Sequence, residues 1–217
     1  MAAYNQLVAG YREFRKDYLG EENREWLNIA KVRQTPKVMM IACSDSRVNP
    51  AIITRCGLGE IFMVNNVANL VPPFEEDKEG KATYHGTSAA IEFGVNHLQV
   101  GHIIIMGHSE CGGIRSLMDD SITKKTKGYS FIKPWMDIVQ EAKDFSRNEK
   151  NIFGKTDRTM VCEKRAVLVS LNNLATFPWV KEAVTSGTLK LHGWYYQINN
   201  GCLSEYNVQT DAFEEII

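Results

Sequence analysis

The sequence has no long apolar run, no excess of charge and no secretory signal. Its apolar stretches reach only five or six residues, whereas a membrane-spanning helix needs about 20. The 25 basic and 26 acidic residues leave a net charge of −1, and no basic stripe indicates binding to nucleic acid. The first 18 residues mix both charges without an apolar core. We therefore expect a cytoplasmic protein with no membrane or nucleic-acid partner.

Cysteines are few, and their number is odd. The five residues are scattered at positions 43, 56, 111, 162 and 202, which suggests no disulfide framework and agrees with a reducing compartment. We interpret Cys56, Cys162 and Cys202 as small core residues. Cys43 and Cys111 differ from these three, because charged residues and a histidine lie close to them in the sequence.

The order of apolar stretches predicts an α/β fold. Buried strands are expected at 38–42, 60–64 and 103–106, and helical spacing is found at 3–18, 87–98, 114–118 and 166–184. Thr87 or Ser88 is the expected cap of the second of these helices. Residues 189–198 and 202–206 are typical of a hairpin that adds to the sheet edge. Strands that alternate with helices favour a central, mainly parallel sheet flanked by helices, formed by one domain over residues 1–217.

Two short runs follow the ends of predicted strands and contain most of the reactive side chains. They are residues 43–47 (CSDSR) and 107–113 (GHSECGG). Ligands bind outside the carboxyl ends of strands in such folds, so both runs are expected at one site. Cys43, His108 and Cys111 form a plausible three-ligand set for one zinc ion per chain, with the fourth position left to water or to Asp45. Three protein ligands and one exchangeable position predict a catalytic zinc site.

The residues between these ligands suggest how the site would work. If Arg47 pairs with Asp45, the carboxylate can accept a hydrogen bond from zinc-bound hydroxide and orient it. If Arg47 releases it, Asp45 can bind zinc as the fourth ligand and close the site. Gly112 and Gly113 allow the backbone to approach a small ligand closely. Two thiolates neutralise Zn²⁺ and weaken it as a Lewis acid, so the site should favour alkaline pH.

At these residues the chain resembles the β-class carbonic anhydrases. The resemblance also covers Gly59 to Phe62, Asn66 to Asn69 and His192 to Trp194. It implies that zinc-bound hydroxide attacks CO₂ to give bicarbonate and a proton, with Asp45 and Arg47 as a catalytic dyad. It further implies a homodimer or larger assembly in which an N-terminal helical arm, residues 1–33, packs on a neighbour. The helix at 3–18 could equally pack on its own domain.

Further positions follow from this resemblance one at a time. Gln34 matches a glutamine that reaches across the dimer to substrate, and Phe62, Val67 and Phe93 match the apolar wall of the CO₂ pocket. Gly112 and Gly113 complete the predicted substrate-binding set. The three wall residues could equally be ordinary core.

The sequence departs from the family pattern at one notable position. Asn65 stands where relatives usually carry an arginine. In one branch of the family that arginine, with a tryptophan and a tyrosine, holds an inhibitory bicarbonate; here Met40 takes the tryptophan position and Tyr196 matches the tyrosine. We therefore expect little closure of the site by bicarbonate.

Other functions are also compatible with these residues. The same zinc chemistry would suit hydrolysis of CS₂ or COS, and a third interpretation is a zinc protein without turnover. A nucleotide-binding site is weaker, because residues 107–113 do not follow the GxGxxG spacing.

Overall fold

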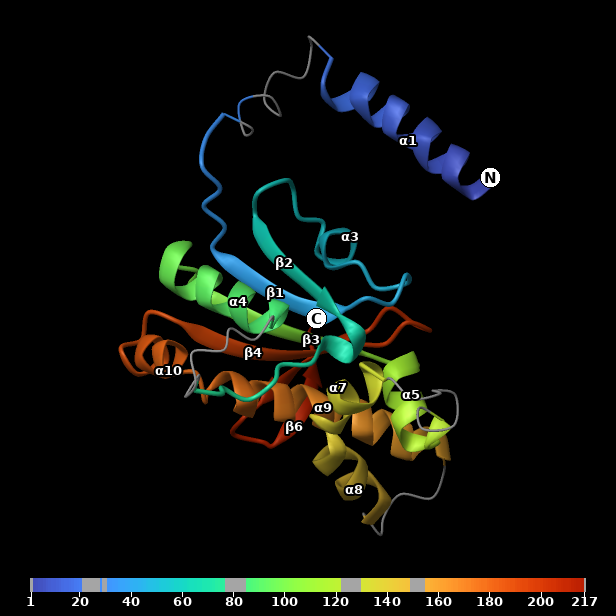
Figure 1. The fold of residues 1–217 in the computed structure, drawn as a ribbon, viewed down its shortest axis with the longest axis vertical. Helices are drawn as coiled ribbons and strands as arrows, with labels where there is room; N and C mark the ends of the chain where they lie inside the picture. The colour runs from blue at the N-terminus through green and yellow to red at the C-terminus, as the bar shows by residue number, and fades with distance from the viewer. Residues whose placement is uncertain are drawn as a thin grey trace.

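A single six-stranded sheet forms the centre of the computed structural model, which describes residues 2–20, 28, 31–76, 85–121, 130–148 and 155–216 (Figure 1). The strands lie in the order β2-β1-β3-β4-β5-β6. The first four of these are parallel and the last two are antiparallel. Their bounds are β1 Val38–Cys43, β2 Ile61–Asn66, β3 His102–His108, β4 Lys190–Tyr196, β5 Leu203–Asn207 and β6 Ala212–Glu215.

Helices connect the parallel strands and cover the sheet. They are α1 Ala2–Tyr18, α3 Pro50–Thr54, η1 Val67–Asn69, α4 Gly86–Glu92, the π-helical η2 Phe93–His97, α5 Gly112–Met118, α7 Ile132–Asp137, α8 Gln140–Asn148, α9 Lys155–Leu174 and α10 Pro178–Thr185. In Figure 1, α5, α7 and α8 gather near one end of α9, whereas α1 stands apart from the rest of the chain.

The two faces of the sheet are buried in different ways. Met39, Ile41, Ile103 and Ile105 alternate along β1 and β3, and they pack in one cluster with side chains of α4, α9 and α10. The intervening residues, Met40, Ala42, Ile104 and Met106, face a smaller cluster that includes side chains of β4 and α3. Every position from Val38 to Ala42 of β1 and from Ile103 to Met106 of β3 is therefore apolar, as expected when both faces are covered.

Helix α9 can approach the sheet closely because residue 107 is a glycine. A Cβ atom at Gly107 would lie 2.5 Å from Cγ2 of Val167, closer than real side chains approach one another. The missing side chain therefore brings the middle of α9 against the carboxyl end of β3. This is the end of the sheet at which His108 lies.

The fold class and most of the predicted elements are confirmed. The three predicted parallel strands and the terminal hairpin are all present, and β1 is the direct neighbour of β3. The helical stretch predicted over 166–184 is present but interrupted, because α9 ends at Leu174 and Pro178 begins a separate helix. The strand β6 was not expected from the sequence.

Two local predictions are also corrected. The helix α4 is capped by His85 without a side-chain hydrogen bond, and the hydroxyl of Thr87 instead accepts a hydrogen bond from the Asn66 amide. Cys162 is buried as expected, but Cys56 and Cys202 are only half-buried.

The first helix has no buried residue in this chain. Its large apolar side chains Tyr4, Leu7, Tyr11, Phe14 and Tyr18 are exposed, and Val8 is half-buried. Residues 1, 21–27, 29 and 30 of the expected arm lie outside the described residues. Across the described part of the chain, no helix combines the length and apolarity that crossing a membrane requires.

Candidate metal centre

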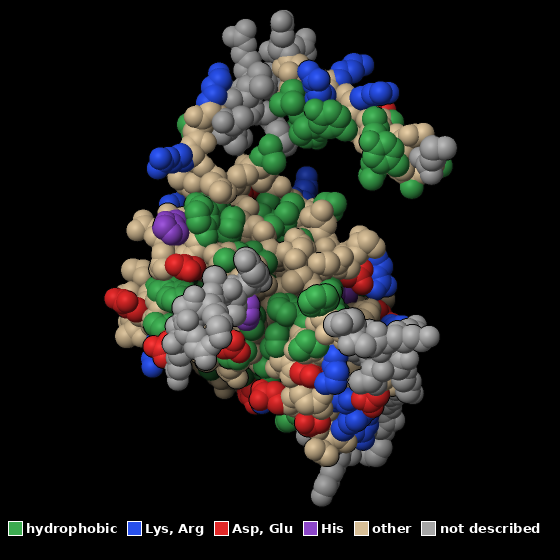
Figure 2. Space-filling model, in the orientation of Figure 1, with side chains coloured by type: hydrophobic (Ala, Val, Ile, Leu, Met, Phe, Trp, Pro, Cys, Tyr) green, Lys and Arg blue, Asp and Glu red, His purple; other side chains and the backbone are tan. Residues whose placement is uncertain are grey.

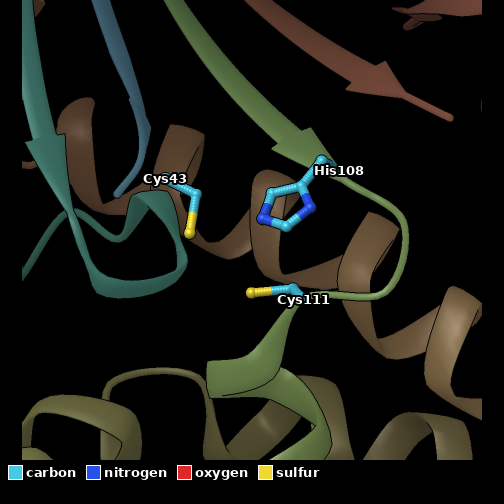
Figure 3. Close-up of side chains that lie close together, drawn as sticks. All are labelled: Cys43, His108 and Cys111. Atoms are coloured by element: carbon cyan, nitrogen blue, oxygen red, sulfur yellow. The ribbon is translucent and has the colours of Figure 1, made fainter. Parts of the chain in front are cut away.

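Three buried ligand residues meet at the carboxyl ends of two neighbouring strands. Cys43 ends β1, His108 ends β3, and Cys111 precedes the first turn of α5 (Figure 3). Their ligand atoms all lie within 4.8 Å of one another, and the residues are at most 5% exposed. Parallel pairing of Ala42 with Met106 brings residues far apart in sequence to this common edge. The predicted ligand set is therefore assembled by the fold.

The histidine is oriented for coordination through one nitrogen. Nδ1 of His108 lies 2.8 Å from the carbonyl oxygen of Ser109, to which it can donate its proton. Nε2 is buried and has no hydrogen-bond partner among the described residues. A ligating histidine commonly donates its other ring N–H to such an acceptor, which fixes the tautomer. The unpartnered Nε2 is thus suited to a metal ion.

The two thiols influence each other's protonation. The adjacent Cys111 thiol stabilises the Cys43 thiolate and lowers the pKa of Cys43 to about 4. The Cys43 thiolate in turn raises the pKa of Cys111, and burial adds to this effect. Burial opposes protonation of His108, but the same thiolate outweighs it, and the imidazole pKa lies above its ordinary value. A metal ion bound here would displace protons, so its affinity should fall as the pH falls.

The ligand set fits zinc. Thiolate sulfur and imidazole nitrogen are the ligands that zinc prefers, and it binds them in a tetrahedral arrangement. The described residues supply three such ligands, and this cluster does not include Asp45. A fourth position therefore remains for an exchangeable ligand, as in catalytic zinc sites.

Asp45 is held beside the cluster by Arg47. Nη2 of Arg47 lies 2.7 Å from Oδ2 of Asp45, while Nε and the backbone N–H of Arg47 donate to Oδ1 at 2.9 and 3.0 Å. These hydrogen bonds and the guanidinium charge keep the pKa of Asp45 well below its usual range. Arg47 also donates to the carbonyl of Glu110 at 3.2 Å. The predicted pair is present, and it is linked to the turn between the two later ligands.

That turn is held from several sides. Glu110 has a φ of 61°, a left-handed conformation that costs a non-glycine residue about 1–2 kcal/mol. The preceding Ser109 donates its N–H to Tyr196 at 2.9 Å and accepts the Ile198 N–H on its hydroxyl at 2.9 Å. The Glu110 carboxylate forms an ion pair with Arg115. These contacts maintain a strained turn that places Cys111 opposite Cys43.

Sequence reasoning missed two buried residues behind Cys111. Glu163 of α9 accepts the Cys111 backbone N–H at 2.9 Å and the Tyr195 hydroxyl proton at 2.7 Å. A signal for Glu163 was available, because it lies at helical spacing with buried Val167, Ser170 and Leu174. An acidic residue in the apolar stripe of a helix is unusual enough to indicate a specific partner.

The structure divides the predicted substrate-binding residues into two groups. Val67 and Gly113 lie beside the cluster, since a Cβ atom on Gly113 would be 3.0 Å from Cγ1 of Val67. Gly112 begins α5 and has open space where a side chain would be.

Phe62 and Phe93 form a separate pair with ring centroids 5.9 Å apart. Phe62 is opposite Met39, four residues or about 13 Å along β1 from Cys43. Gln34 is exposed in the segment before β1. Phe93 is 43% exposed, so its interpretation as core is wrong for the single chain.

Asn65 and Met40, which replace the arginine and the tryptophan of relatives, both have structural roles in this chain. The side-chain amide of Asn65 donates to the Cys43 carbonyl at 3.0 Å and ties the ends of β2 and β1 together. Met40 is buried in the sheet. The expected weak response to bicarbonate stays a prediction.

Comparisons with known proteins agree on one family. The model of the carbonic anhydrase family matches residues 38–203. Beta carbonic anhydrase 3 of Arabidopsis thaliana is 36% identical over 202 residues, which cover 92% of this chain and 75% of that protein. The structure of the β-carbonic anhydrase CcaA matches with a TM-score of 0.88 and 27% identity, covering 100% of this chain and 93% of that one. The structure of the β-carbonic anhydrase CafA of Aspergillus fumigatus matches with a TM-score of 0.77 and 27% identity. This match covers 94% of this chain and 90% of that one.

Removal of one thiol should abolish tight metal binding. We expect Cys111→Ser to bind zinc more than about 100-fold more weakly than wild type, because loss of even an outer-shell partner costs about 10–100-fold. Competition with a chelator measures this affinity, and wild-type binding should weaken as the pH is lowered. Cys202→Ser, which changes a half-buried cysteine outside the cluster, is the matched control. Tight binding of one zinc per chain by Cys111→Ser would contradict the assigned ligand set.

Proposed function

The chain belongs to the β-class carbonic anhydrases, and from this premise we propose that it hydrates CO₂ reversibly with zinc held by Cys43, His108 and Cys111. The observation that carries the proposal is the buried cluster with its unpartnered histidine nitrogen, adjacent to the Asp45–Arg47 pair. Bound zinc would supply a Lewis acid that lowers the pKa of water, although two thiolate ligands weaken it and move hydroxide formation toward alkaline pH. The remaining steps depend on side chains of this chain.

Asp45 is proposed to orient the attacking group rather than to remove its proton. Both carboxylate oxygens are occupied by Arg47, and the strongly lowered pKa makes this carboxylate a poor proton acceptor. Oδ2 accepts only the Nη2 hydrogen bond, so it still has a lone pair that can accept another one. A fixed acceptor of this kind directs an oxygen lone pair toward CO₂ without neutralising the nucleophile. Arg47 is the positioning residue of the dyad.

Val67 and Gly113 are proposed to form the wall next to the reacting atoms. CO₂ is uncharged and small, so an apolar surface favours its entry over that of water. Gly113 already packs against Val67 and the Ala68 side chain, and a larger residue would fill this space. Gly112 leaves the neighbouring backbone accessible to the substrate.

We propose that a second copy of the chain completes each site. Phe62 and Phe93 lie too far along the sheet to contact the cluster of their own chain, and Gln34 is exposed. A groove of about 780 Å³ runs between the free edge of β2 and α7, where Phe62, Asn65 and Trp135 contribute to its lining. An apolar groove beside an unpaired strand edge is a natural surface for association.

The helix α1 is proposed to be part of the same interface. Leu7 is 75% exposed and Tyr11 is 58% exposed, and Figure 2 shows hydrophobic side chains gathered on one side of this helix. An amphipathic helix that buries none of its residues gains stability by packing its apolar side on another surface. We retain residues 1–33 as the proposed arm of a single domain over 1–217.

We also propose a cytoplasmic location, which is supported by five free cysteines.

Hydration of CO₂ followed by stopped flow tests the proposed reaction. Zinc-loaded wild type should be active, with a rate that rises through alkaline pH because two thiolates weaken the Lewis acid. Asp45→Ala should retain its zinc and lose about 100-fold or more in kcat, since the acceptor that orients the nucleophile is gone. Asp137→Ala, which breaks an exposed pair with Lys133, should match wild type.

The outcomes separate two levels of the proposal. Full activity of Asp45→Ala would refute the dyad and leave the reaction intact. A wild-type protein with one zinc per chain and no hydration at any pH would refute the reaction, and CS₂ and COS would be the next substrates to assay.

Charged substitutions on α1 test the assembly. Leu7→Glu with Tyr11→Glu places two charges on the apolar side of the helix, so the oligomer measured by analytical ultracentrifugation should dissociate to smaller species with lower activity. Asn5→Glu with Ala9→Glu adds the same charges on the opposite side and should preserve the oligomer. Identical sedimentation of the two double variants would rule out a role for this side of α1.

A further inference from the structure

A buried carboxylate behind Cys111 has no role in the proposed reaction. Glu163 is 4% exposed and is the only buried acidic residue in the described part of the chain. Its oxygens bind two different elements, with Oε1 accepting the Cys111 N–H and Oε2 accepting the Tyr195 hydroxyl proton. Burial of a charged group is costly unless hydrogen bonds compensate it. Its position beside a metal ligand therefore suggests a specific purpose.

The carboxylate fixes the backbone at the point where the last ligand begins. Ser109 and Glu110 alone separate His108 from Cys111, and Glu110 holds an unfavourable left-handed conformation. The Cys111 N–H donates to Glu163 and would be buried without an acceptor if that side chain were removed. Because the thiol is only two bonds from its own Cα atom, a rotation of this backbone redirects the sulfur away from Cys43.

The surroundings hold Glu163 in place from the opposite side. Tyr195 is fully buried and pairs in register with Gly107, the residue whose missing side chain admits α9. The Lys164 ammonium lies 5.1 Å from the centre of the Tyr195 ring and covers it. The tyrosine hydroxyl thus reaches the carboxylate from a rigid strand, and this contact limits movement of Glu163.

We propose that Glu163, anchored by Tyr195, is a positioning residue that directs the Cys111 thiolate and so sets the affinity and geometry of the metal site. The inference rests on the metal site of the proposed function. Helix α9 and strand β4, which lie outside the two ligand-bearing motifs, thereby influence the metal directly. Outer-shell hydrogen bonds of this kind typically alter metal affinity about 10–100-fold.

Cobalt(II) provides a probe that does not depend on activity. Its visible absorption reports coordination geometry and thiolate ligation, and a titration gives its affinity. Glu163→Met removes the acceptor at similar size, and we expect about 10–100-fold weaker binding with altered bands. Glu163→Gln keeps an oxygen acceptor for the Cys111 N–H and should restore most of the affinity and the wild-type bands. Tyr195→Phe, which removes only a hydroxyl, should fall between the two and provides a milder variant if Glu163→Met does not fold.

Ser170→Ala is the matched control on the same helix. Ser170 is fully buried and accepts the Val71 N–H at 3.3 Å, but it does not contact the cluster. Its loss should lower the thermal midpoint while cobalt affinity and spectrum stay at their wild-type values. Wild-type cobalt binding by both Glu163→Met and Tyr195→Phe would overturn the inference, as would equal spectral changes in Ser170→Ala. A wild-type chain that binds no cobalt would overturn the metal site itself.

Discussion

Parallel pairing of β1 with β3 is the constraint on which the site depends. It places the end of β1 beside the end of β3, so that Cys43 and His108 face one another although 64 residues separate them in the sequence. The middle of both strands is apolar because helices cover one face and side chains of α3 and β4 pack on the other. The hydrophobic core thus determines the relative position of two ligands, and a shift in strand register would separate them.

The third ligand depends on a short turn rather than on the sheet. Glu110 is strained, and the turn is maintained by a hydrogen bond that Arg47 donates and by two that Tyr196 and Glu163 accept. Arg47 holds Asp45 and the turn at once, so the acceptor and the metal ligands keep a common geometry. This arrangement agrees with the general observation that strain persists at functional sites only where the surroundings support it.

Features that depend on a local sequence pattern could be predicted, including the central strands and the metal ligands at their ends. Apolar strands that end in Cys43 and His108 indicated both the sheet and the metal site, and the Asp45–Arg47 pair followed from its place between them. The break before Pro178 was missed although proline is a strong helix-start signal. Glu163 and Tyr195 could not be paired from sequence, because only the approach of α9 over Gly107 brings them together. The location of Phe62 and Phe93 away from the cluster likewise depends on strand register.

X-ray absorption at the zinc edge of the purified protein tests the central claim most directly. Ligation by Cys43, Cys111 and His108 predicts two sulfur atoms at about 2.3 Å and two nitrogen or oxygen atoms at about 2.0–2.1 Å, one of them from imidazole. A first shell with four sulfur atoms would indicate a structural site made from other cysteines. A shell without sulfur would contradict the account entirely.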